Sequence, residues 1–245
     1  MRAFYESNLA LIHNAGFGAL ATGAGRIVLD HLRRRAREGK GEDALVDLGC
    51  GSGVLAEQIS LMGFPVVGID LSAHLVRLAQ SRVPRGTFQV GSIYEVELPR
   101  AAAVTMIGEV VNYSVAGKPQ ADDLAALLQR IHAALEPGGL LLFDAAAPGR
   151  QAGSARQSFR HGPDWTVLVD QREDGRVLTR EITTFRAAGD LFRRESEQHV
   201  LHLWPADEME GALAHAGFSV ALIDRYDDVA LPPGLVGYRA ERLPG

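Results

Sequence analysis

A glycine-rich turn between a short apolar run and an amphipathic segment constrains this chain more than any other feature. Residues 44–48 have the composition of a short buried strand, and Gly49-Cys50-Gly51-Ser52-Gly53 follows directly. Residues 54–61 then carry apolar side chains at helical spacing. A strand, a glycine turn and a helix in this order aim backbone N–H groups and the positive end of a helix at a ligand. The sequence therefore predicts a ligand site at residues 49–53.

An acidic residue follows this turn at the distance expected for binding a ribose. Asp70 ends the next apolar run, residues 65–69, roughly 20 residues after the turn. At the C-terminal edge of a parallel strand, a carboxylate can accept hydrogen bonds from ribose hydroxyls. The combination favours a nucleoside-bearing ligand over a tight turn that binds nothing.

The spacing of the glycines distinguishes among nucleotide sites. A dinucleotide site needs a small residue three positions after Gly51, where this chain has Val54. A P-loop needs Gly-Lys-Ser or Gly-Lys-Thr after the glycines, and this chain has neither. The run from Asp47 to Gly53, D-x-G-x-G-x-G, resembles motif I of the class I S-adenosylmethionine-dependent methyltransferases.

A second stretch resembles the same family independently. Residues 121–135 place leucine and isoleucine on one helical face, Glu136-Pro137-Gly138-Gly139 ends this helix, and residues 140–144 form an apolar run. A helix, an L-x-P-G-G turn and a hydrophobic strand follow one another in the same way in the methyltransferases. The resemblance covers Leu45 to Asp144. It implies an α/β fold with a Rossmann-like, seven-stranded, mostly parallel sheet sandwiched by helices.

The whole chain, residues 1–245, is expected to form a single methyltransferase domain. Its segments are an N-terminal helical cap (1–43), a cofactor-binding core (44–148), an antiparallel β insertion (160–204), and a C-terminal helix with closing strands, the last antiparallel (205–245).

The insertion is predicted from three runs rich in β-forming residues. Two hairpin turn sequences, Glu173-Asp174-Gly175 and Ala188-Gly189-Asp190, separate these runs. Charged residues alternate along them, as in a sheet with one solvated face. The insertion is open to two interpretations, a lid over a small acceptor and a dimer interface.

The resemblance implies S-adenosylmethionine as the cofactor and assigns its parts to residues. Asp47 and the glycines would hold the methionine part, and Asp70 the ribose. Leu71 and Ile93 would pack on the adenine, with Ser92 at its edge where the family usually has an acidic residue. The cofactor-binding residues expected on this basis are Tyr5, Asp47, Gly49, Cys50, Gly51, Gly53, Asp70, Leu71, Ser92, Ile93 and Gly108.

Residues near the transferred methyl group are expected where the apolar run 101–107 ends. Gly108-Glu109-Val110-Val111-Asn112-Tyr113 follows it, at the motif IV position of the family. The family members that methylate adenine or amides typically have Asn or Asp, two prolines and an aromatic residue there, so methylation of nucleic-acid bases is not expected.

A general base is needed only if the acceptor arrives protonated. Glu109 is the first candidate and His13 the second, and Asn112, Tyr113 and Phe17 are the expected substrate-binding residues. Packing alone explains Tyr5 and His13 equally well, and it explains Phe17 better.

Composition limits the classes of methyl acceptor and the cellular compartment that are expected. The net charge is −5 and no basic groove is evident, so no nucleic-acid partner is expected. No signal peptide is evident and no apolar stretch approaches the length of a membrane span, so no membrane partner is expected. The single cysteine, Cys50, excludes an internal disulfide and fits a cytoplasmic enzyme. The histidines and Cys50 offer no metal-ligand spacing, so no metal is expected.

The sequence therefore predicts transfer of a methyl group from S-adenosylmethionine to an N or O nucleophile of a small molecule, by in-line displacement, in a monomer or homodimer. Two alternatives stay open. One is an RNA or protein methyltransferase, and the other is a non-catalytic S-adenosylmethionine-binding protein that uses the insertion for interactions.

Overall fold

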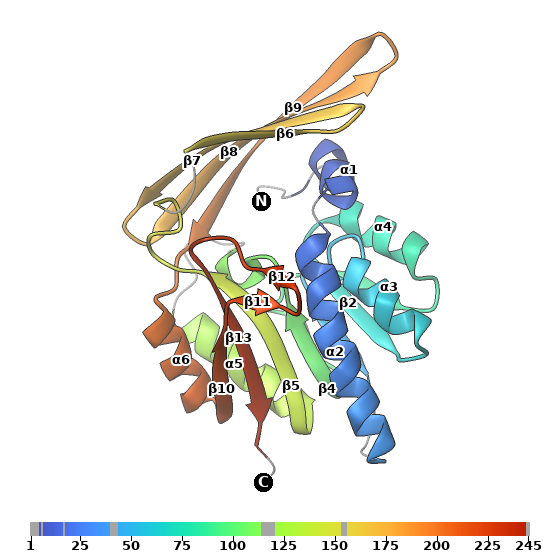
Figure 1. The fold of residues 1–245 in the computed structure, drawn as a ribbon, viewed down its shortest axis with the longest axis vertical. Coiled ribbons are helices and arrows are strands. Elements are labelled where there is room, and N and C mark those ends of the chain that lie inside the picture. The colour runs from blue at the N-terminus through green and yellow to red at the C-terminus, as the bar shows by residue number, and fades with distance from the viewer. Residues whose placement is uncertain are drawn as a thin grey trace.

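A seven-stranded sheet forms the centre of the protein, in the order β10-β13-β5-β4-β1-β2-β3 (Figure 1). The computed structural model describes residue 5 and residues 7–16, 18–39, 44–113, 121–152 and 156–243. Within these residues, β13 runs antiparallel to β10 and β5, and the other strands are parallel to one another. The strands are β1 (Leu45–Leu48), β2 (Val66–Asp70), β3 (Thr87–Val90), β4 (Ala101–Met106), β5 (Leu135–Ala146), β10 (Phe218–Ile223) and β13 (Leu235–Arg242). The predicted Rossmann-like, mostly parallel sheet is confirmed.

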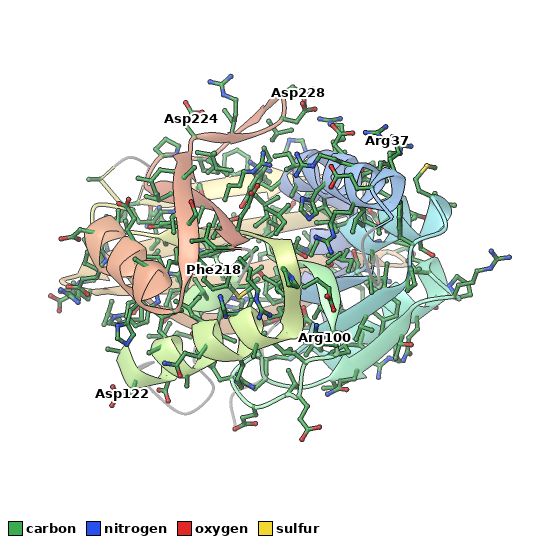
Figure 2. The ribbon with its side chains drawn as sticks, turned by 90° about the horizontal axis from the view of Figure 1, so that it is seen from below. Arg37, Arg100, Asp122, Phe218, Asp224 and Asp228 are labelled. Atoms are coloured by element: carbon green, nitrogen blue, oxygen red, sulfur yellow. The ribbon has the colours of Figure 1, made fainter. Side chains whose placement is uncertain are left out.

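Helices cover both faces of this sheet. One face is covered by α2 (Ala19–Arg37), α3 (Val54–Leu61) and α4 (Ala73–Arg82), and the other by α5 (Ala121–Ala134) and α6 (Ala206–His215). Figure 2 shows Arg37 at the end of α2 and Asp122 on α5 on opposite sides of the molecule. The central strands are therefore buried on both faces, which is why they have continuous apolar sequences.

The strand β1 illustrates how one apolar run supplies two cores. Val46 and Leu48 belong to the apolar cluster shared with α5 and α6, whereas Leu45 belongs to the cluster shared with α2 and α3. All three side chains are fully buried. Because successive side chains of a strand point to opposite faces, both helical layers pack on the same four residues. This packing fixes the end of β1, from which the glycine turn begins.

The insertion is a separate four-stranded antiparallel sheet that lies beyond one end of the central sheet (Figure 1). Its strands are β6 (Gln157–His161), β7 (Trp165–Asp174), β8 (Val177–Ala188) and β9 (Leu191–His202). The sequence predicts three strands in an insertion that begins at residue 160. The structure has four, and β6 is the strand that was not predicted. Every residue of β6 is exposed, so this strand has no alternation of polar and apolar residues to reveal it. The two predicted hairpin turns are confirmed.

The inserted sheet leaves and rejoins the core at one place. The backbone N–H of Trp204 donates to the carbonyl oxygen of Ala146 at 3.0 Å. The residue at which β5 ends is thus hydrogen-bonded to a residue that follows β9.

The predicted N-terminal cap divides into two parts. The helix α1 (Ser7–Gly16) lies between the inserted sheet and α4 (Figure 1), and it contacts β7, β8 and α4. In contrast, α2 packs along the central sheet and against the small hairpin β11 (Arg225–Tyr226) and β12 (Val229–Ala230). Among the described residues of the cap, Tyr5, residues of α1 and the first residues of α2 line the ligand cavity described below. The described helices include none that is long and apolar enough to cross a membrane.

Candidate active site

A cavity of about 540 Å³ lies between the inserted sheet and the edge of the central sheet where β1, β2 and β4 end. Its lower half is lined by the glycine turn and the residues after β2 and β3, and its upper half by α1 and the inserted sheet. The cavity brings together most residues predicted from the sequence: Tyr5, His13, Asp47, Gly49, Cys50, Gly51, Asp70, Leu71, Ser92, Ile93, Gly108, Glu109 and Tyr113. Gly53 and Asn112 do not line it, and Phe17 lies outside the described residues.

The glycine turn and Asp70 hold each other in place. The backbone N–H of Gly51 donates to Oδ2 of Asp70 at 2.9 Å, and the N–H of Ser72 donates to Oδ1 at 2.8 Å. Gly51 has a φ of +54°, and a Cβ at this position would meet no atom within 4 Å. The backbone is therefore bare on its cavity side, and a ligand can approach it closely.

Gly53 has a different role from the predicted one. Its φ is +80°, and a Cβ there would lie 3.1 Å from the Cβ of Ala79 on α4. Gly53 begins α3 and lets α3 and α4 approach each other. The third glycine of the motif thus supports helix packing, and its assignment as a cofactor-binding residue is not supported by its position.

Two buried carboxylates lie under the lower half of the cavity. Asp47 accepts a hydrogen bond from the Thr105 hydroxyl at 2.7 Å, and burial raises the pKa of Asp47 to about 7. Burial also raises the pKa of Asp70, although the N–H groups of Ser72 and Gly51 oppose this change. A positively charged ligand group beside these carboxylates would favour their ionised forms. This half of the cavity is suited to a cation.

The residues expected around adenine are present at one wall. Leu71, Ser92 and Ile93 line the cavity together. The hydroxyl of Ser92 already accepts a hydrogen bond from the N–H of Tyr94 at 3.2 Å, and Arg130 holds the carbonyl oxygen of Ile93 at 2.9 Å. This wall therefore offers apolar contact and a fixed backbone more than a strong side-chain acceptor.

The turn after β4 is fixed by Asp144. The N–H groups of Gly108 and Glu109 donate to the two oxygens of this carboxylate, at 2.9 and 2.6 Å, and the hydroxyl of Tyr226 donates to it at 3.0 Å. Glu109 consequently adopts a φ of +63°, which is uncommon for a residue with a side chain. Its side chain is directed at two arginines.

Glu109 is ion-paired with Arg150 and Arg180. Arg150 Nε lies 2.8 Å from Oε1, and Arg180 donates to both carboxylate oxygens, at 2.5 and 3.0 Å. Burial alone would raise the pKa of Glu109, but Arg180 and Arg150 lower it to about 2. A carboxylate with so low a pKa is a weak base at neutral pH. The prediction of Glu109 as general base is therefore not supported by its contacts, and the ion triad ties β8 to the core.

His13, the second candidate base, lies near the upper half of the cavity. Burial lowers the pKa of His13 to about 4. Its ring meets that of Tyr5 edge-on, with 5.1 Å between the ring centroids. Its position agrees with the prediction, but its low pKa makes it a weak base at neutral pH.

Asn112 is a structural residue and not part of the cavity wall. It is fully buried, its Oδ1 accepts from the N–H of Ala146 at 2.9 Å, and its Nδ2 donates to the carbonyl oxygens of Ala146 and His202. The prediction that it binds substrate is not supported, because its amide already joins the end of β5 to the end of β9.

Two polar residues that were not predicted as site residues, His199 and Glu197, lie beside the predicted Tyr113 in the upper half. Tyr113 lies within hydrogen-bonding distance of His199, 3.2 Å from Nδ1, and Nε2 of His199 lies 3.0 Å from Oε2 of Glu197. In the sequence, His199 is one of the histidines whose spacing offers no metal site, and it is not a candidate for catalysis. A histidine and a glutamate two positions apart on a strand share one face, which was the available signal. Among the described residues, no three His, Cys, Asp or Glu side chains are grouped to hold a metal ion.

Comparisons with known proteins agree with this geometry. A family model described as a methyltransferase domain matches residues 23–223. The dTDP-3-amino-3,4,6-trideoxy-alpha-D-glucopyranose N,N-dimethyltransferase of Streptomyces venezuelae is 24% identical over 213 residues, which cover 80% of this chain and 83% of that protein. The ubiquinone biosynthesis O-methyltransferase of Bradyrhizobium sp. (strain ORS 278) is 30% identical over 102 residues, 40% of this chain and 38% of that protein.

Solved structures share the whole fold. The crystal structure of Streptomyces venezuelae DesVI matches with a TM-score of 0.78 at 22% identity, and the match covers 100% of both chains. A S-adenosylmethionine-dependent methyltransferase from Clostridium acetobutylicum ATCC 824 matches with a TM-score of 0.78 at 17% identity, over 96% of this chain and 98% of that one. Since the family model spans most of the chain, this protein belongs to the methyltransferase-domain family and is a S-adenosylmethionine-dependent methyltransferase with a Rossmann-like sheet.

Proposed function

We propose that this enzyme methylates an amino group of a small polar molecule, with a hydroxyl group as the second candidate nucleophile. The observation that carries the proposal is that the inserted sheet and α1 cover the cavity. The inserted sheet contributes Val167, Gln171 and Arg180 to the lining, and α1 contributes Leu9. A small molecule fits inside such an enclosure, and we expect a helical nucleic acid or a folded protein surface to be too large to reach its floor.

The comparisons favour nitrogen over oxygen. A continuous match to 80% of this chain must include both Gly51 and Arg180, so the likeness to the sugar N,N-dimethyltransferase extends across both halves of the cavity. The match to the O-methyltransferase covers 40% of the chain and is too short to reach from Asp47 to His199. The first likeness therefore includes the half that would hold the acceptor.

The residues of the lower half fit the cofactor. Gly51 leaves its backbone bare, and Asp70 and Asp47 offer carboxylates beside it. We assign the methionine part to the glycine turn and Asp47, the ribose to Asp70, and the adenine to the wall formed by Leu71, Ser92 and Ile93. When bound, S-adenosylmethionine supplies a methyl group that its sulfonium already activates.

The chain itself contributes placement and the exclusion of water. Leu9, Val167 and Ile182 pack together where α1 meets the inserted sheet, and all three are buried. Holding two reacting atoms about 3–3.5 Å apart in line can supply much of the rate enhancement of a displacement reaction. We infer that the inserted sheet acts as a lid for this purpose.

The outer face of the inserted sheet exposes Phe159 and Leu168, which are cross-strand neighbours. The interpretation of this sheet as a dimer interface therefore stays a prediction, as do the monomeric or dimeric state and the cytoplasmic location.

The experiment has two stages. First, titration calorimetry measures binding of S-adenosylhomocysteine to the purified protein. Second, mass spectrometry follows methyl transfer to dTDP-3-amino-3,4,6-trideoxy-alpha-D-glucopyranose, to a panel of simple amino sugars, and to the matching sugars with hydroxyl in place of amine. We expect binding and methylation of at least one amine, with its hydroxyl analogue slower.

Transfer RNA and a protein extract serve as rival acceptors in the same assay. Methylation confined to either of these would overturn the proposal. Binding of S-adenosylhomocysteine with no transfer to any acceptor would favour the non-catalytic alternative. Gly51→Val serves as the control that lacks the cofactor site.

A further inference from the structure

A chain of hydrogen bonds crosses the upper half of the cavity and ends at a buried carboxylate. A side-chain hydrogen bond joins Tyr5 to Tyr113. Tyr113 in turn lies 3.2 Å from Nδ1 of His199, and Nε2 of His199 lies 3.0 Å from Glu197. The side chains of His199 and Glu197 are 1% and 8% exposed. Placement of methyl donor and acceptor does not by itself require such a chain.

The partners fix the tautomer of His199. An ionised carboxylate can only accept a hydrogen bond, so Nε2 of His199 carries a proton and donates it to Glu197. Nδ1 is then an acceptor, and the Tyr113 hydroxyl donates to it. Burial raises the pKa of Tyr113, which keeps this hydroxyl protonated until a base takes its proton. His199 is thus placed as a base for the Tyr113 hydroxyl and is itself oriented by Glu197.

The backbone holds this arrangement firmly. Tyr113 forms an antiparallel bridge with Leu201 of β9, so it is paired with the strand that carries His199. Glu197 also accepts a hydrogen bond from the N–H of Tyr5 at 2.8 Å. Tyr5, Tyr113 and His199 all line the cavity.

We propose that Tyr113 and His199 remove a proton from the acceptor before methyl transfer, with Glu197 as the positioning residue. This inference depends on the proposed function, in which the acceptor is an amine that arrives as its ammonium form. One N–H proton passes to the oxygen of Tyr113 while the hydroxyl proton of Tyr113 passes to Nδ1 of His199. The products are a neutral amine, a neutral tyrosine and an imidazolium beside the Glu197 carboxylate.

Methyl transfer follows, and the proton held by His199 is finally released to solvent. The amine uses its freed electron pair to form the nitrogen–carbon bond, while the carbon–sulfur bond breaks and its electron pair stays on sulfur. His199 releases its proton to solvent after the products depart. One proton is therefore released in each turnover, as the overall reaction of an ammonium acceptor requires.

Other charged and titratable groups around His199 are less suited to this role. Tyr5 faces it from the N-terminal segment, with 5.2 Å between ring centroids, and His13 lies behind Tyr5. Arg180 on β8 and Glu109 are close enough to Tyr113 to affect its pKa, but they are paired with each other. His199 is thus the imidazole with both a carboxylate partner and a hydroxyl that lines the cavity.

The test measures kcat/KM against pH for methylation of an amine that the wild-type enzyme accepts. The wild-type enzyme is compared with His199→Gln, Tyr113→Phe and Glu197→Gln, and His202→Gln is the matched control. His202 is on the same strand but does not line the cavity. Without the base, the enzyme depends on the small fraction of free amine in solution. We expect His199→Gln to lose about 100-fold at pH 7 and to recover most of this loss as the pH approaches the amine's own pKa.

Tyr113→Phe should behave in the same way as His199→Gln, Glu197→Gln should lose less, and His202→Gln should follow the wild-type profile. Losses of equal size at every pH would show a structural role and overturn the proposal. Titration calorimetry with S-adenosylhomocysteine should give wild-type affinity for His199→Gln and Tyr113→Phe.

If the wild-type enzyme methylates no amine, the proposed function fails first, and NMR then tests the relay independently. Long-range ¹H–¹⁵N spectra of the S-adenosylhomocysteine complex at pH 8 should show His199 as the Nε2–H tautomer, changed in Glu197→Gln. The opposite tautomer would overturn the relay.

Discussion

Replacement of Glu109 by glutamine tests whether the ion triad holds the inserted sheet to the core. Glutamine has the same shape, but it leaves the charges of Arg150 and Arg180 without a carboxylate. The side chains of these arginines are 12% and 14% exposed, so their charges are poorly hydrated. Removing one partner of a buried ion pair typically costs about 3–5 kcal/mol.

The pKa of Glu109 gives a second value for the stability that the ion triad contributes. Its folded value of about 2 lies below the ordinary 4.5, and each pH unit corresponds to about 1.36 kcal/mol, so the pairing stabilises the fold by about 3 kcal/mol. Because the folded pKa is depressed, this contribution is complete above about pH 5 and is lost as the pH falls through 4.5 towards 2. For a chain of this length the loss corresponds to a fall in Tm of roughly 6–12 °C.

Urea unfolding of wild type and Glu109→Gln at pH 7, 5, 4 and 3 measures this difference directly. The matched control is Glu208→Gln, which removes a bidentate partner of Arg176 at the surface and should leave the free energy of unfolding nearly unchanged. Hydrogen exchange should locate the loss in β7, β8 and β9. A difference below about 1 kcal/mol at pH 7, or one that stays constant down to pH 3, would refute the reasoning.

Three further substitutions separate cofactor binding from stability. Asp70→Ala should weaken S-adenosylhomocysteine binding roughly 10- to 100-fold in calorimetry, since it removes charge-assisted hydrogen bonds, and wild-type affinity would exclude the ribose assignment. Gly51→Val should abolish this binding while circular dichroism stays native, because the added side chain fills the bare side of the turn; retained binding would contradict the close approach. Asn112→Ala should lower the free energy of unfolding by about 2–3 kcal/mol with unchanged cofactor affinity, and an unchanged free energy of unfolding would contradict its structural role.

The lower half of the cavity could be predicted because its signals are local. The strand, turn and helix around Gly51 occupy adjacent residues, and Asp70 follows one strand later, so spacing alone places them at one sheet edge. Gly53 shows the limit of this reasoning. The motif predicts a glycine at this position, but only the contact with Ala79 on α4 shows that the glycine allows the two helices to pack closely.

The contacts made in the upper half could not be predicted, although Tyr5, His13 and Tyr113 were candidates, because the partners are distant in sequence. Arg180 is 71 residues from Glu109, and His202 is 90 residues from Asn112. A polar residue at the end of a buried strand has the same local pattern whether it faces substrate, an arginine or a backbone carbonyl. The relay from Tyr113 to Glu197 depends in the same way on the pairing of β9 with residues far earlier in the chain.

The hydrogen bond between Trp204 and Ala146 joins the two ends of a loop that contains the whole inserted sheet. Residues 147–203 therefore leave the central fold and return to it at one place, and the strands β1, β2 and β4, whose ends form the lower half of the cavity, lie outside this segment. If the proposed function holds, we expect a graft of this segment from a relative, made together with the residues Glu109, Asn112 and Tyr113 that contact it, to change acceptor preference and to leave the donor site in place.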